Sequence, residues 1–138
     1  MKKILYFLPI SILLIFSSCN KNNRVSKQIN GEWNIDIYSI KQESNGEVTY
    51  EESFYNFGTF LFNSDNSMGV LDTETNSFNI TNYFLSYDGT LLNIKFDSSG
   101  EYVKYVITDY SKKTLMTITN ESTIQGIKYT SVYVLSKK

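Results

Sequence analysis

Histidine is absent from the 138 residues, and cysteine and proline occur once each. Without histidine and with a single thiol, the chain cannot build a His/Cys zinc site, a Ser-His-Asp triad or a Cys-His pair. A disulfide within the chain is excluded too, so the core itself must hold the fold. No spacing of the remaining carboxylates, hydroxyls and lysines assembles a nucleophile with its base. We therefore expect no enzymatic activity, no catalytic or metal-binding residues and no cofactor.

The only long apolar run lies near the N-terminus, at Ile4–Phe16. The basic pair Lys2-Lys3 precedes it, and the small residues Ser17-Ser18 follow it. This order is typical of a secretory signal. The run is shorter than the roughly 20 apolar residues that span a membrane, which makes an uncleaved anchor the less favoured alternative. We predict that residues 1–18 are a signal peptide.

The lone cysteine, Cys19, ends this segment and would be the first residue of the mature chain. The arrangement resembles the lipobox of bacterial lipoproteins, with Phe16 in place of the more usual leucine. The resemblance implies a diacylglycerol on the sulfur of Cys19 and an acyl chain such as palmitate on its amine. Because one acyl chain binds a bilayer only marginally, several chains are needed for a stable anchor. The alternative is a free structural cysteine.

We therefore expect the membrane to be a partner, through the lipid on Cys19. The expected location is the bacterial cell envelope, with the outer membrane favoured over the inner one. Neither Asn20 nor Lys21 is acidic, so nothing at these positions indicates special sorting. Residues 19–28 are polar apart from Cys19 and Val25 and read as the lipidated cysteine and a flexible tether. Residues 29–138 remain as one domain.

The charge of the mature chain excludes nucleic acid as a partner. Removal of Lys2 and Lys3 leaves 11 of the 13 basic residues against 14 acidic ones, a net charge of −3. No basic patch is present to neutralise phosphates. Glu51 and Glu52 are adjacent carboxylates, but nothing beside them would separate their pKa values, so we interpret them as solvated residues of a polar connection.

Aromatic residues are abundant, with 11 tyrosines and 9 phenylalanines, and the one proline, Pro9, lies within the signal. This composition favours strands, and no segment sustains the 3.6-residue period of a helix. Polar turns such as Asn45-Gly46 and Asp88-Gly89 separate the apolar segments. We predict an all-β, eight-stranded, antiparallel up-and-down barrel; an open meander or a two-sheet sandwich is the alternative. The expected strands span residues 31–41, 54–63, 68–73, 77–87, 90–96, 101–110, 114–120 and 127–135.

Several short motifs resemble those of the lipocalin superfamily, and more closely those of lipocalin-like lipoproteins of Bacteroidota type. They are Gly31-Glu32-Trp33, the stretch from Gly58-Thr59-Phe60 to Asp65, the terminal Tyr133–Lys137, and Thr108-Asp109-Tyr110. The resemblance implies a barrel that Gly31 and Trp33 close at one end. It also implies a basic residue packed over the tryptophan, for which Lys128 is the nearest candidate.

Two functions follow for such a barrel. An eight-stranded interior holds one small ligand or only side chains. We favour a non-enzymatic binding module for a small apolar ligand. The alternative is an envelope protein with a solid core that meets a protein partner through an exposed, tyrosine-rich surface. The candidate ligand-lining residues are Ile35, Ile37, Phe60, Phe62, Phe84 and Phe96.

Overall fold

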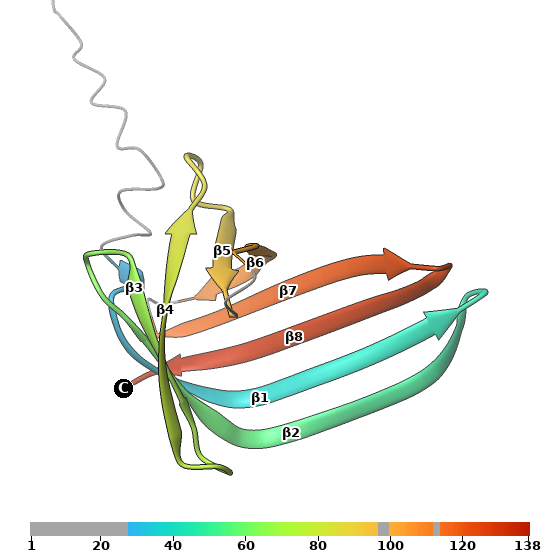
Figure 1. The fold of residues 1–138 in the computed structure, drawn as a ribbon, viewed down its shortest axis with the longest axis horizontal. Coiled ribbons are helices and arrows are strands. Elements are labelled where there is room, and N and C mark those ends of the chain that lie inside the picture. Colours follow the sequence, from blue (N-terminus) through green and yellow to red (C-terminus); the bar gives the residue numbers. More distant parts are fainter. Residues whose placement is uncertain (1–27, 97–99, 112–113) are drawn as a thin grey trace, which may run out of the picture.

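Eight antiparallel strands close into a barrel in sequence order, with β8 pairing back onto β1 (Figure 1). The computed structural model describes residues 28–96, 100–111 and 114–138. The predicted up-and-down barrel is confirmed, and the open meander and the sandwich are excluded. The predictions for residues 1–27, including the lipid on Cys19, lie outside the described residues. The strands are β1 (Gly31–Ser44), β2 (Glu47–Phe62), β3 (Ser67–Asp72), β4 (Ser77–Leu85), β5 (Leu91–Lys95), β6 (Val103–Ser111), β7 (Leu115–Ile124) and β8 (Ile127–Lys137).

Two tight turns join the longest strands. Asn45 and Gly46 link β1 to β2 with φ values of 54° and 83°, and Gln125 and Gly126 link β7 to β8 with 52° and 81°. Two consecutive residues with positive φ are the mark of a type I′ hairpin turn. The first turn was expected from its Asn-Gly pair. The second was not expected, so the predicted end of β7, at Asn120, lies four residues before its observed end at Ile124.

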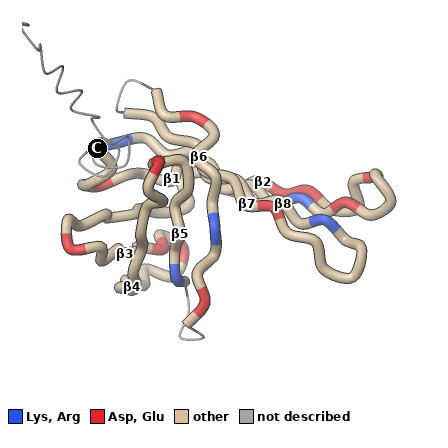
Figure 2. Tube along the Cα trace, turned by 90° about the horizontal axis from the view of Figure 1, so that it is seen from above, with Lys and Arg blue, Asp and Glu red and all other residues tan. Residues whose placement is uncertain are grey.

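The four strands β2, β1, β8 and β7 continue beyond the barrel as a projecting sheet (Figures 1 and 2). The pairing of β3 with β2 ends at Gly58 and Asp72, and that of β6 with β7 ends at Val106 and Thr119. Past these points the four strands pair only with one another. We call this projecting sheet, residues 37–55 and 120–134, the wing. The sequence predicted its strands in part but not its projection.

A β-bulge re-aims the side chains of β1 where the barrel passes into the wing. The pairing with β8 slips between Ile35 and Ile37, so Asp36 is an extra residue on β1. Tyr38 therefore points to the inner side, where its ring stacks on that of Tyr133 at 4.5 Å. Ile37 lies on the outer face. The expectation that Ile37 shares the inner face with Trp33 and Ile35 is wrong, because it assumed unbroken alternation.

The other end of the barrel is packed solid around Trp33. The indole is fully buried, and its Nε1–H donates a hydrogen bond of 2.6 Å to the carbonyl of Ile29. The ammonium of Lys137 lies 5.4 Å from the centre of the ring and donates to the carbonyl of Gln28 at 2.6 Å. Lys137, rather than Lys128, is thus the cation over the tryptophan.

Gly31 allows this packing. Its φ of 116° is one that L side chains rarely adopt, and a Cβ there would lie 3.3 Å from Cε of Lys137. The ring of Tyr110, from the Thr-Asp-Tyr motif, lies 6.3 Å from that of Trp33. Two motifs about 75 residues apart in the sequence therefore meet at the closed end.

Candidate binding cavity

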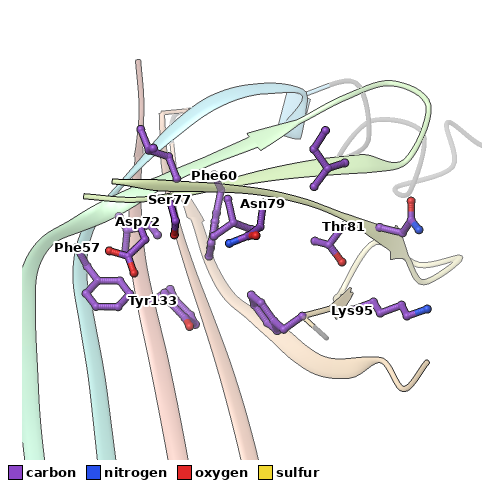
Figure 3. A pocket seen from close by; sticks show the side chains of 14 residues that line it. Phe57, Phe60, Asp72, Ser77, Asn79, Thr81, Lys95 and Tyr133 are labelled. Carbon is purple, nitrogen blue, oxygen red and sulfur yellow. The ribbon is translucent and has the colours of Figure 1, made fainter. Parts of the chain in front are cut away.

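The barrel interior is hollow toward the end opposite Trp33. A cavity of about 550 Å³ lies between the inner faces of β1, β2, β3 and β4, with Phe96 after β5 and Tyr133 of β8 completing it (Figure 3). The described pairing of β4 with β5 ends at Asn82 and Lys95. The cavity opens beside this point, because both residues line it.

One wall of the cavity is aromatic and apolar. Phe60 is buried, and its ring lies 5.4 Å from that of Tyr133 and 6.5 Å from that of Phe96. Tyr133 also contacts Tyr105, with ring centres 5.7 Å apart. Burial raises the pKa of the Tyr133 phenol, which therefore stays neutral at physiological pH. Ile35 also lines this wall, which suits a flat apolar group.

The facing wall is polar. Ser77, Asn79 and Thr81 alternate with outward residues along β4, and all three line the cavity. They carry neutral hydroxyl and amide groups that can both donate and accept hydrogen bonds. Phe78, between Ser77 and Asn79, faces outward and is 56% exposed, whereas Ile80, between Asn79 and Thr81, is 75% exposed and also borders the cavity. The polar side chains therefore face inward on β4, the reverse of an ordinary half-buried strand.

The rim of the cavity carries charge. The carboxylate of Asp72 accepts backbone N–H groups from Glu74 at 2.8 Å and Thr75 at 3.1 Å. These hydrogen bonds, the one from Thr75 first, lower the pKa of Asp72, so the group is anionic at neutral pH. Lys95 lies across the opening from it (Figure 3). A ligand at the opening would thus meet both signs of charge.

Three of the predicted lining residues, Ile35, Phe60 and Phe96, do line the cavity. Phe62 does not, because it pairs with Met68 closer to the packed end. There its ring packs against that of Tyr83, with ring centres 4.9 Å apart. Its assignment as a lining residue is corrected to the solid core.

Phe84 does not line the cavity either, but for another reason. It follows the inward Tyr83 on β4, so alternation places it on the outer face, 44% exposed, with its ring 5.0 Å from that of Tyr102. Ser77, Asn79 and Thr81 line the cavity but were not predicted from the sequence. Their signal was the two-residue spacing of small polar residues that ends in the buried Tyr83.

In the part of the chain that the structure describes, no three histidine, cysteine, aspartate or glutamate side chains are grouped to hold a metal ion. Among the same residues, no helix has the length and apolarity to cross a membrane.

Comparisons with known proteins do not identify a family for the chain. No protein-family model matches the chain, and no curated protein matches its sequence. Among solved structures, lobster apocrustacyanin A1 is similar, with a TM-score of 0.46 and 10% sequence identity over 85% of this chain and 68% of that chain.

Proposed function

We propose that the barrel is a non-enzymatic binding module for one small amphipathic ligand. The observation that carries this proposal is the division of the cavity into an aromatic wall, with Phe60, Phe96 and Tyr133, and a hydrogen-bonding wall on β4. Ligand cavities in proteins are typically 300–1,000 Å³ and mostly apolar, with a few placed polar groups, and a cavity of about 550 Å³ fits this description.

The two walls refine the expected ligand from apolar to amphipathic. A purely apolar molecule would desolvate Ser77, Asn79 and Thr81 without replacing their hydrogen bonds to water, which costs free energy for each group. A molecule with a flat apolar face and a row of hydroxyl, carbonyl or amide groups satisfies both walls. Such a ligand would lie with its apolar face on Phe60 and Phe96.

The experiment compares two phenylalanines of similar exposure. Phe96 is 41% exposed and lines the cavity, whereas Phe84 is 44% exposed and lies on the outer face. The probe is the amphipathic dye 1-anilinonaphthalene-8-sulfonate, followed by its fluorescence. Phe96→Ala is expected to weaken dye binding about tenfold, the effect of losing one aromatic contact, and Phe84→Ala is expected to leave it unchanged. Equal effects of the two substitutions would refute binding in the cavity.

A second pair of variants tests the polar wall. Asn79→Trp would fill the space between the walls from an exposed position and is expected to abolish dye binding. The same substitution at Phe78, which is 56% exposed on the outer side of β4 and does not line the cavity, is the control. Native mass spectrometry of the purified protein then identifies molecules retained from the cell. Retention of the same molecule by the filled variant would contradict the assignment of the cavity.

We further propose that a lipid on Cys19 tethers this module to a membrane of the bacterial cell envelope. The support is the order of basic head, apolar run, small residues and cysteine at the N-terminus. Cys19→Ala in the full chain is expected to move the protein from the membrane fraction to the soluble fraction. Unchanged membrane association, with palmitate labelling absent from both forms, would contradict the tether.

An interaction protein with a tyrosine-rich surface is the second candidate. Its support is the exposure of four tyrosines, Tyr50 at 40%, Tyr55 at 71%, Tyr87 at 81% and Tyr102 at 44%. Tyr83, Tyr105 and Tyr133 are instead buried. The four exposed tyrosines lie on separate segments of the chain, except that Tyr50 and Tyr55 are both on β2, the outer edge strand of the wing.

A further inference from the structure

We propose that the outer edge of β2 in the wing binds an extended, basic peptide segment of another protein as an added strand. The pairing of β3 with β2 ends at Gly58 and Asp72, and the hydroxyl of Thr73 then donates to the carbonyls of Asn56 and Phe57, both at 3.0 Å. Beyond this point, no strand of the described residues pairs with the outer side of Glu47–Tyr55. Nine residues span about 30 Å, enough for a full added strand.

A small hollow lies where this edge begins. Phe54, Tyr55, Asn56 and Phe57 from β2, with Thr73 and Glu74 after β3, surround about 270 Å³. A strand added to Glu47–Tyr55 would run in line with β3 and end at this hollow. Its terminal side chain would then lie among the aromatic residues Phe54, Tyr55 and Phe57 and near Glu74.

The edge is acidic on both faces. Glu51 and Glu52 are successive residues of β2, so their side chains point to opposite faces of the sheet, and both are exposed. Lys41, the cross-strand partner of Glu51, places its ammonium 3.2 Å from Glu43 instead. Glu47 adds a third carboxylate to the run. A lysine or arginine on either face of an added strand would therefore lie next to a carboxylate. Figure 2 shows the acidic positions of the wing in red.

The same charges argue against a second copy of the chain as the occupant. Antiparallel overlap of two Glu47–Tyr55 runs sets Glu51 opposite Glu51 of the other copy, and like charges directly opposite destabilise a strand pair. Carboxylates on an edge strand also block aggregation, which is the alternative explanation for them. A basic strand would instead place lysine or arginine opposite these carboxylates, so that its pairing with this edge is stabilised.

The other edge of the wing fits such a peptide less well. On β7 only Asn120–Ile124 extends past the pairing with β6, which is five residues. Its one carboxylate, on Glu121, lies 2.8 Å from the ammonium of Lys128 and is neutralised by it. Glu121 therefore provides a matched control position on an otherwise similar edge.

The probe is a ten-residue peptide in which two threonines alternate with two lysines, so that lysines lie on both faces of the added strand, and it is titrated into the purified, ¹⁵N-labelled protein. Chemical-shift changes and slowed amide exchange are expected within Glu47–Tyr55, and the affinity should fall as salt is added. The double variant Glu51→Lys with Glu52→Lys is expected to weaken binding about tenfold or more, because two attractive pairs become repulsive. Glu121→Lys is expected to leave the affinity within about twofold. A peptide with glutamate in place of lysine should bind only the double variant.

Three results would overturn the proposal. The first is an absence of shifts in Glu47–Tyr55 at millimolar peptide. The second is equal weakening by the Glu121 and the Glu51/Glu52 substitutions, which would indicate a diffuse charge effect. The third is self-association of the protein alone that protects the same amides, which would make a second copy the occupant. Unchanged spectra of the variants away from the wing verify that the barrel is folded.

Discussion

Gly58→Ala tests how tightly β2 and β3 pack at Gly58. A Cβ built at Gly58 would lie 2.2 Å from the carbonyl oxygen of Leu71 and 3.3 Å from its carbonyl carbon. Because carbon and oxygen normally approach to about 3.3 Å, the methyl group overlaps the oxygen by roughly 1 Å. The obstacle is backbone and cannot rotate away as a side chain would. β3 must therefore move away from β2 at the pair of Gly58 with Asp72.

Overpacking of this kind costs about 1–3 kcal/mol, and the rigid obstacle places Gly58→Ala near 3 kcal/mol. Gly46→Ala is the control, since its φ is 83° but no heavy atom lies within 4 Å of a new Cβ. Left-handed strain alone there costs about 1 kcal/mol. In urea unfolding, Gly58→Ala should lose about 2 kcal/mol more than Gly46→Ala, or about 8 °C in Tm for a domain of this size. Equal losses would refute the packing argument.

Three further predictions concern single groups. Lys137→Met removes a hydrogen bond to the carbonyl of Gln28 and the cation above Trp33. In urea unfolding it should lower the free energy of unfolding by about 2 kcal/mol. The control, Lys138→Met, breaks only an exposed ion pair and should cost less than about 0.5 kcal/mol. The Tyr110 hydroxyl is buried with no hydrogen-bond partner among the described residues, so Tyr110→Phe should leave stability unchanged or raise it by about 1 kcal/mol; a loss would reveal a missing partner. Hydrogen bonds from Ser86 and Thr90 in its own turn lower the pKa of Asp88 to about 2. The contribution of the Asp88 carboxylate to folding stability is therefore complete above pH 4 and is lost as pH falls toward 2. A midpoint near 3.8 in a carboxyl NMR titration would contradict the turn geometry.

The barrel could be predicted from the sequence because its turns are local. Asn45-Gly46 and Asp88-Gly89 both connect consecutive strands, and the two-residue period of the segments between them fixes which residues can share a face. Short connections between neighbouring antiparallel strands leave few topologies other than an up-and-down barrel or a meander. Closure itself depends on the pairing of β1 with β8, which no local pattern encodes.

The errors in the candidate site have different physical origins. A β-bulge adds a residue without leaving a composition signal, and every side chain past it changes face. Asp36 moved Ile37 outward in this way. Phe84 failed for a different reason: its hydrophobicity was taken as evidence of burial, yet its neighbour Tyr83 holds the inward position and hydrogen-bonds the carbonyl of Asn63 at 2.9 Å. On an aromatic-rich strand, hydrophobicity alone does not tell the two faces apart.

The contrast between the two ends of the barrel explains why a cavity exists in a chain so rich in aromatic residues. At the closed end, successive inward positions of neighbouring strands carry Trp33, Phe62 and Met68, which fill the section completely. Toward the open end, the inward positions of β4 are Ser77 and Asn79, whose small volumes leave the space beside Phe60 empty of protein. Larger apolar residues at these two positions would bury more surface and stabilise the fold. Their polarity is therefore a cost to stability, and such local departures from the best core are expected where a site binds something.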